Sequence, residues 1–299
     1  MRIFLTGATG FVGSAILPEL HSAGHQVLAL ARSEHSANAV ISAGAKILRG
    51  DLRDPASLRK GAEEADAVIH AAFDHDFSRF AESCEMDRQA IEILGTALEG
   101  TGKKLIVTSG LPVIEDRAAT ERDAPPAGAH GIPRVSEQTA MAFRENGVDV
   151  SVIRMPQVHD RERQGFASYL MSHAREAGVS AYVGTGENRW PAVHRLDAAR
   201  LYKIVLDRGL SGSYYHAVAE EGVPVREVAE VIGTALDVPV KSVSVDAAPA
   251  HFGWLARIAQ MDVPASSALT RIELDWKPVE RDGLLVNVRK ARQDAVLAR

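Results

Sequence analysis

The chain opens with Met1-Arg2-Ile3-Phe4-Leu5-Thr6-Gly7-Ala8-Thr9-Gly10-Phe11-Val12-Gly13, an apolar run that leads straight into a glycine-rich turn. Residues 3–5 are typical of a buried parallel strand. Gly7, Gly10 and Gly13 lack Cβ atoms, which allows a tight turn and the close approach of a phosphate. A helix expected from about Gly10 to Leu20 would present unpaired N–H groups and the positive end of its dipole to that phosphate.

The residues that follow complete the pattern. A second apolar run, Gln26–Leu30, comes after a polar connection at residues 21–25. Strand, glycine turn, helix and strand in this order form a βαβ unit, which distinguishes a dinucleotide-binding turn from an ordinary one without a ligand. We therefore predict that the phosphates of a dinucleotide lie against Gly7, Thr9, Gly10, Phe11, Val12 and Gly13.

The end of the second strand indicates which dinucleotide binds. A carboxylate there would bind the ribose 2′-hydroxyl of NAD, but this chain has Arg32 and Ser33, with no acid before Glu34. A guanidinium beside a hydroxyl suits a 2′-phosphate. This placement favours NADP over NAD, and the alternative is an arginine in a solvated loop.

Composition excludes several classes of protein. The 299 residues are 46% hydrophobic and 24% charged, as in ordinary globular proteins, and the formal net charge of −5 argues against a nucleic-acid partner. No apolar run reaches the ~18 residues of a membrane span, and the chain begins without a signal-peptide pattern. A single cysteine, Cys84, fits a reducing cytoplasm, and no Cys/His cluster has the spacing of a metal site. We expect a cytoplasmic protein with a small-molecule substrate.

The first half of the chain alternates strands with helices. We predict further strands at 45–50, 67–72, 104–109 and 148–154, and helices at 37–43, 55–61, 86–100 and 133–146. This order predicts an α/β fold, a Rossmann-type doubly wound parallel sheet. We expect a dinucleotide-binding domain at 1–155 and a smaller, mainly substrate-binding lobe at 156–299, with segments near 190–218 returning to the first domain.

Ligands of such sheets bind beyond the carboxyl ends of the strands. Asp51 follows the third strand and can accept a hydrogen bond from the adenine amino group, while Leu52 packs on the ring; capping of the next helix is the alternative for Asp51. Ala71 and Ala72 follow the fourth strand and leave room for ribose and phosphates. We expect the loop at 74–77, Asp-His-Asp-Phe, to line a substrate cleft, with metal ligation as the alternative.

These motifs resemble those of the extended short-chain dehydrogenases/reductases, the superfamily of NAD-dependent epimerases/dehydratases and 3β-hydroxysteroid dehydrogenases. The matching segments are residues 6–13, 50–52, 70–72, 107–110, 153–156 and 184–199. The resemblance implies that Thr108 and Ser109 lie beside the reacting groups and that Pro156 lies near the nicotinamide. It also implies either a monomer or a homodimer formed through the helices at 86–100 and 133–146.

The superfamily's catalytic tyrosine and lysine, four residues apart, are missing. No tyrosine occurs before Tyr169, and the best register places His130 at the tyrosine position and Arg134 at the lysine position. Histidine exchanges protons near neutral pH, and arginine can hold a ribose hydroxyl. We therefore take Ser109, His130 and Arg134 as the catalytic candidates; alternatively, His130 is a surface loop residue and Pro133 starts a helix.

Three functions fit these observations. The first is an NADP-dependent oxidoreductase that acts on a small carbonyl or alcohol compound. The second is a non-catalytic NAD(P)-sensing protein, which would keep the glycine turn and lose the tyrosine. The third is a nucleotide-sugar epimerase or dehydratase, which the missing tyrosine disfavours because those reactions also begin with alcohol oxidation.

Overall fold

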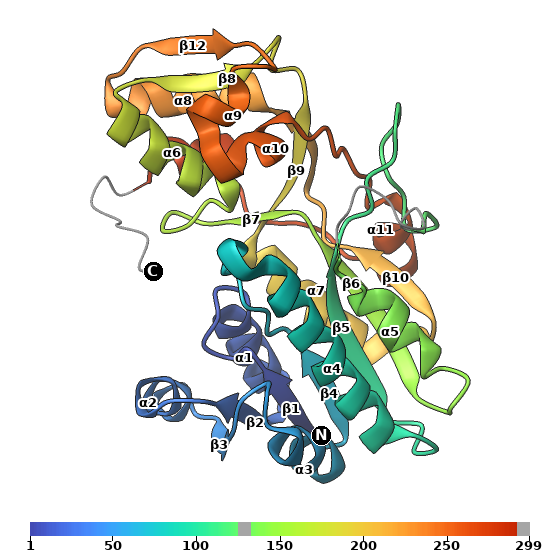
Figure 1. Ribbon diagram of the computed structural model, residues 1–299. Coiled ribbons are helices and arrows are strands. Elements are labelled where there is room, and N and C mark those ends of the chain that lie inside the picture. Colours follow the sequence, from blue (N-terminus) through green and yellow to red (C-terminus); the bar gives the residue numbers. More distant parts are fainter. Residues whose placement is uncertain (125–132, 292–299) are drawn as a thin grey trace.

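The computed structural model describes residues 1–124 and 133–291. A seven-stranded parallel sheet in the order β10-β6-β5-β4-β1-β2-β3 forms the lower part of the molecule in Figure 1. Its strands are β1 Arg2–Thr6, β2 Gln26–Ala31, β3 Lys46–Arg49, β4 Ala67–His70, β5 Lys104–Gly110, β6 Asp149–Met155 and β10 Ser213–His216.

Helices cover both faces of this sheet. Ile3 and Leu5 of β1 are fully buried in a core shared with α1 (Gly13–Ser22) and α7 (Arg195–Arg208). Phe4, between them, points to the opposite face. The helices on that face are α3 (Pro55–Glu64), α4 (Phe80–Leu98) and α5 (Ser136–Ala142). Side chains of successive strand residues point to opposite faces, so a continuous apolar run supplies both cores. Helix α2 (Glu34–Ser42) lies beside β2 and β3.

A smaller lobe lies above the sheet in Figure 1. Strand β7 (Gln157–His159) continues from β6 and belongs to a second sheet with β9 (Arg189–His194) and β11 (Glu220–Pro224). Strands β8 (Ser180–Val183) and β12 (Val240–Val243) form a third. The helices of this lobe are α6 Phe166–Ala177, α8 Val225–Leu236, α9 Ala248–Phe252, α10 Ala256–Gln260 and α12 Leu284–Arg289, while α11 Ala268–Leu274 packs against α7 and β10.

The predicted strands of the first half are present, each within two residues of its expected ends, and the doubly wound α/β class is confirmed. Four helix starts differ. Helix α1 begins at Gly13 instead of Gly10, α2 at Glu34 instead of Ala37, α4 at Phe80 instead of Met86, and α5 at Ser136 instead of Pro133. Helix α7 and strand β10 pack with the first sheet. The division into a dinucleotide-binding domain at 1–155 and a mainly substrate-binding lobe at 156–299 stays a prediction.

No helix of residues 1–124 and 133–291 is long and apolar enough to cross a membrane.

Candidate functional site

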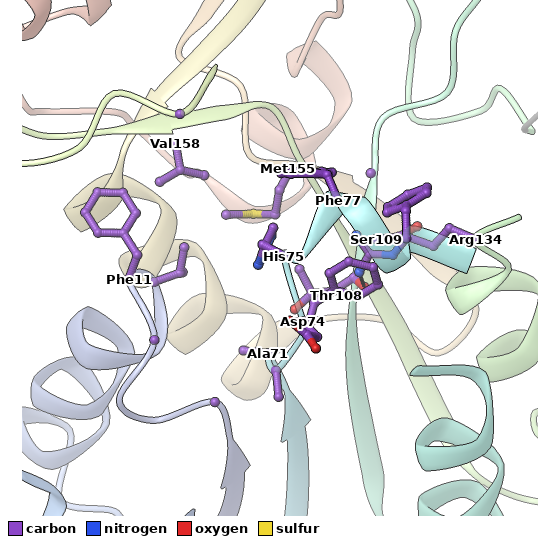
Figure 2. A pocket seen from close by; sticks show the side chains of 18 of the residues that line it. Phe11, Ala71, Asp74, His75, Phe77, Thr108, Ser109, Arg134, Met155 and Val158 are labelled. Atoms are coloured by element: carbon purple, nitrogen blue, oxygen red, sulfur yellow. Dashed lines mark hydrogen bonds between the residues drawn. The ribbon is translucent and has the colours of Figure 1, made fainter. Parts of the chain in front are cut away.

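A cleft of about 1200 Å³ opens where the carboxyl ends of the first sheet's strands meet the smaller lobe (Figure 2). Every predicted site residue that the structure describes lines this cleft: Gly7, Thr9, Gly10, Phe11, Val12, Gly13, Arg32, Asp51, Leu52, Ala71, Ala72, Thr108, Ser109, Arg134 and Pro156. His130 lies outside the described residues.

The glycine turn is shaped so that only glycines fit. Gly7 has φ of +76°, and a Cβ atom there would lie 2.7 Å from the backbone nitrogen of Ala72. A Cβ atom on Gly13 would lie 2.0 Å from the carbonyl oxygen of Gly7. The Gly10 N–H donates to that same oxygen at 2.8 Å, so Gly10–Val12 form a turn and the helix starts three residues later than expected. No side chain caps α1, and its Ser14 and Ala15 N–H groups donate to the carbonyls of Gly10 and Val12, so that the turn and the start of the helix form one hydrogen-bonded unit.

Basic side chains line the end of the cleft beyond β2. Arg32 is exposed, and no carboxylate in the described part of the chain pairs with it. Glu34, the nearest acid in sequence, pairs with Arg49 instead. Ser33 and Ser36 cap α2 reciprocally, which fixes the turn that carries Arg32. Arg53 also lines this end, and the sequence reasoning did not single it out.

Asp51 does not cap the helix that follows it. Its Oδ1 accepts from the Arg53 N–H at 2.9 Å, while Asp54 is the N-cap of α3 and accepts from the Ala56 N–H at 3.1 Å. The two carboxylates therefore have different tasks, and Asp51 and Leu52 stay on the wall of the cleft.

At the end of β5, two neighbouring hydroxyls differ in their surroundings. The Thr108 hydroxyl donates to the His70 carbonyl at 2.8 Å and bonds the Tyr202 hydroxyl at 2.6 Å. Burial raises the Tyr202 pKa, so this phenol holds the strand end and does not titrate near neutral pH. Ser109 is almost fully buried and lines the cleft. Of the two hydroxyls, that of Ser109 is better placed to meet a ligand.

Arg134 precedes α5 and reaches the floor of the cleft. Its Nη2 donates to the Thr108 carbonyl at 3.0 Å and its Nε to the Ser136 hydroxyl at 2.8 Å. The guanidinium also lies 4.1 Å from the centre of the Phe73 ring, a cation–π contact. Pro133 therefore does not begin the helix: α5 starts at Ser136, with Val135 as its N-cap residue, and Arg134 contacts the end of β5.

A buried polar network fixes Arg134 from behind. Asp87 of α4 is 1% exposed; it accepts from Ser136 and lies 3.2 Å from His70 Nε2 and 3.9 Å from Arg134 Nε. His70 Nδ1 lies 2.8 Å from the Thr6 hydroxyl at the end of β1. Burial opposes ionisation of Asp87, but its hydrogen bonds with His70 and Ser136 and the charges of His70 and Arg134 outweigh it and lower the pKa. The network thus links the glycine turn to Arg134.

Aromatic side chains from both lobes close the far end of the cleft. Phe77, on the loop between β4 and α4, stacks on Trp254 of the smaller lobe at 5.1 Å between ring centres. The rings of Phe166 and Tyr169 on α6 lie 5.4 and 6.2 Å from Phe77. The rings of Phe166, Tyr169 and Trp254 from the smaller lobe thus contact Phe77 from the loop after β4, and these contacts join the two walls of the cleft. The position of Trp254 in the sequence gives no indication of this contact. Aromatic rings here suit an apolar ligand.

The last residues of β7 and β9 are histidines that hold the structure together through hydrogen bonds. His159 is 1% exposed, lies outside the cleft and bonds Asn287 at 2.9 Å. His194 is the N-cap of α7, and its Nδ1 accepts from the Leu196 N–H at 3.3 Å. Asp197 is buried in the first turn of α7, where it accepts from the Val279 and Glu280 N–H groups.

The fold and this cleft define a nucleotide-binding protein with a Rossmann-type sheet. The chain belongs to the NAD(P)H-binding family, whose model matches residues 7–181. The resemblance to the extended short-chain dehydrogenase/reductase superfamily is confirmed, with the tyrosine–lysine pair absent.

The chain is similar to three further proteins. An uncharacterized protein of Saccharomyces cerevisiae is 45% identical over 97% of this chain and 98% of its own. The decarboxylating sterol-4-alpha-carboxylate 3-dehydrogenase of Dictyostelium discoideum is 25% identical over 76% of this chain and 74% of its own. A double mutant of the dTDP-glucose 4,6-dehydratase DesIV of Streptomyces venezuelae, solved with NAD bound, shares the fold with a TM-score of 0.76, at 21% identity and 98% coverage of both chains.

Proposed function

We propose that this protein is an NADP-dependent oxidoreductase that acts on a small carbonyl or alcohol compound. The observation that carries the proposal is the shared cleft: the glycine turn, Arg32 and Arg134 line one cavity whose far end is aromatic. The positions where a Cβ atom would collide with backbone are those against which a pyrophosphate would lie.

Each end of the cleft has its own task in this proposal. Arg32, with no carboxylate partner in the described part of the chain, would bind the 2′-phosphate. Asp51 and Leu52 would bind the adenine, and Arg134 would hold the nicotinamide ribose as the superfamily's lysine does. When bound, the cofactor supplies or accepts the hydride. Ser109 would donate to the reacting oxygen.

A binding measurement tests the cofactor half. NADPH at ~100 times its Kd should stabilise the protein by about 2.7 kcal/mol and raise the melting temperature accordingly. NADH at the same concentration should raise it less. Equal shifts would remove the argument from Arg32, and no shift with either would remove the dinucleotide site.

An absorbance assay tests the catalytic half. Aliphatic and aromatic ketones and aldehydes are offered singly, and loss of NADPH absorbance is followed. Turnover of any of them supports the oxidoreductase. Tight NADPH binding without turnover of any carbonyl compound would favour the second candidate, an NAD(P)-sensing protein, for which the missing tyrosine argues. Turnover of UDP- or dTDP-glucose instead would favour the epimerase or dehydratase, to which the fold is also similar.

A further inference from the structure

His75 is the one histidine among the described residues that line the cleft. It lies on the loop that connects β4 to α4, a few residues after Ala71 and Ala72. In the view of Figure 2 its ring reaches into the cleft between Phe11 on one wall and Ser109 and Arg134 on the other. The ring thus faces the space that a nicotinamide and a substrate would share.

The loop holds this ring in place. The His75 ring meets the Phe73 ring edge-on at 5.2 Å and the Phe77 ring at 6.2 Å. The loop itself is fixed by Asp74, whose Oδ1 accepts from the Asp76 N–H at 3.1 Å. Asp76 in turn caps the 3₁₀ helix Phe77–Arg79 and pairs with Arg79. Both carboxylates are therefore engaged within the loop, which argues for a shaped cleft wall rather than a metal site.

The charges that face His75 favour its neutral form. The protein around the cleft walls desolvates the ring, although the ring is open to the cleft itself, and this effect lowers the pKa most. The Arg134 cation lowers it further, and Arg163 adds a smaller effect of the same sign. A hydrogen bond to the Phe73 carbonyl and the Asp74 carboxylate act in the opposite direction. The net result is a histidine that loses its proton more readily than usual.

We propose that His75 exchanges the proton of the substrate oxygen, the task of the tyrosine that is missing from the superfamily's usual position. The proposal rests on the proposed function. In the direction of reduction, a C–H bond forms at the carbonyl carbon with the hydride of NADPH while the C=O π bond breaks. The oxygen takes the proton of the His75 imidazolium, and the neutral ring then regains a proton from water. In the direction of oxidation, the neutral ring takes the hydroxyl proton.

This assignment fixes the pH dependence of both directions. Reduction needs the protonated ring, so its kcat falls as the pH rises through the His75 pKa, which lies below 6.5. Oxidation needs the neutral ring, so its kcat rises through the same pKa and is level at neutral pH. Replacement of the Arg134 charge, as in Arg134→Gln, removes one cause of the lowering and moves both midpoints to higher pH.

The test compares three histidine variants with the wild type. His75→Asn should lower kcat about 10²- to 10⁴-fold, the range for loss of a general acid–base group. It should largely preserve the NADPH-induced rise in melting temperature, since the phosphates and the adenine would bind at the glycine turn, Arg32 and Asp51. His130→Asn tests the competing candidate, and His21→Asn, on α1 away from the cleft, is the matched control. NMR titration of the His75 ring, without cofactor, should give a pKa below 6.5 that rises in Arg134→Gln.

Two further readouts separate proton transfer from a structural role. Imidazole in the assay buffer should restore part of the activity of His75→Ala and none of that of a cleft variant such as Phe77→Leu. The pH midpoint should vanish from the kcat profile of His75→Asn.

The proposal is overturned if His75→Asn keeps wild-type kcat and pH profile, or if only His130→Asn shows the loss. A wild-type protein that binds NADPH and reduces no carbonyl compound overturns the proposed function instead, before any variant is compared.

Discussion

Replacement of Arg32 by alanine should weaken the binding of NADPH about 10-fold and leave the binding of NADH unchanged. Hydrogen bonds between a guanidinium and a phosphate contribute ~1.5–3 kcal/mol. Arg32 is exposed, so solvent screening places the expected loss at the lower end, and ~1.4 kcal/mol is tenfold in Kd. The Ser33 and Ser36 cap and the Glu34–Arg49 pair do not depend on Arg32, so α2 should stay folded.

Titration of the protein with each dinucleotide, followed by calorimetry at fixed salt, measures this difference. Arg59→Ala is the matched control, because Arg59 is an exposed arginine of α3 outside the cleft. Arg32→Asp should go further and favour NADH, since a carboxylate at the end of this strand binds the ribose hydroxyl and repels the 2′-phosphate. Equal losses for both dinucleotides in Arg32→Ala, or the same loss in Arg59→Ala, would refute the assignment of Arg32 to the 2′-phosphate.

Three other outcomes follow from the geometry. Gly13→Ala places a Cβ atom 2.0 Å from the Gly7 carbonyl oxygen and should abolish the NADPH-induced thermal shift, whereas Gly110→Ala, which meets no atom within 4 Å, should keep it. Asp87→Asn leaves Arg134 without its buried counter-charge and should lower the free energy of unfolding by ~1–3 kcal/mol in urea and raise the KM for NADPH; unchanged values of both would contradict the network. Burial lowers the His216 pKa to about 4, below its ordinary value of 6.5, so the stability that neutral His216 contributes is present above pH 6.5 and is lost as the pH falls to 4. The loss is about 3 kcal/mol, and His216→Gln should flatten that part of the pH dependence of unfolding.

The sequence predicted the strands well because their signal is local. Residues 3–5 and 67–69 are continuous apolar runs, and a parallel strand covered on both faces needs such a run. The glycine turn was equally easy to predict. Gly10 and Gly13 approach the Gly7 carbonyl within the turn, and Gly7 approaches the backbone of Ala71 and Ala72, which follow the neighbouring strand β4. Cys84 of α4 is 2% exposed, and burial raises its pKa to about 11.

The features that the sequence did not predict depend on contacts between distant residues. Helix α5 begins after Arg134 because the Arg134 side chain donates a hydrogen bond to the Thr108 carbonyl at the end of β5. No capping residue near Pro133 in the sequence predicts this contact. Asp87 lies inside an amphipathic helix and would pass for a surface residue, yet its partners His70 and Ser136 come from two other elements. Trp254 reaches the cleft from the smaller lobe, and no pattern in the sequence around Arg53 predicts that this residue lines the cleft.

The late position of strand β10 in the sequence affects folding during synthesis on the ribosome. A nascent chain that has emerged only through residue 155 exposes β6 as an unpaired sheet edge, because the strand that covers it spans residues 213–216. The buried Arg154 on β6 then has Glu137 as a partner but lacks His216, which arrives with β10. Unpaired edges invite pairing with other chains. We therefore expect ribosome-bound chains that stop before residue 216 to be held by chaperones, and chains that extend past it to be released.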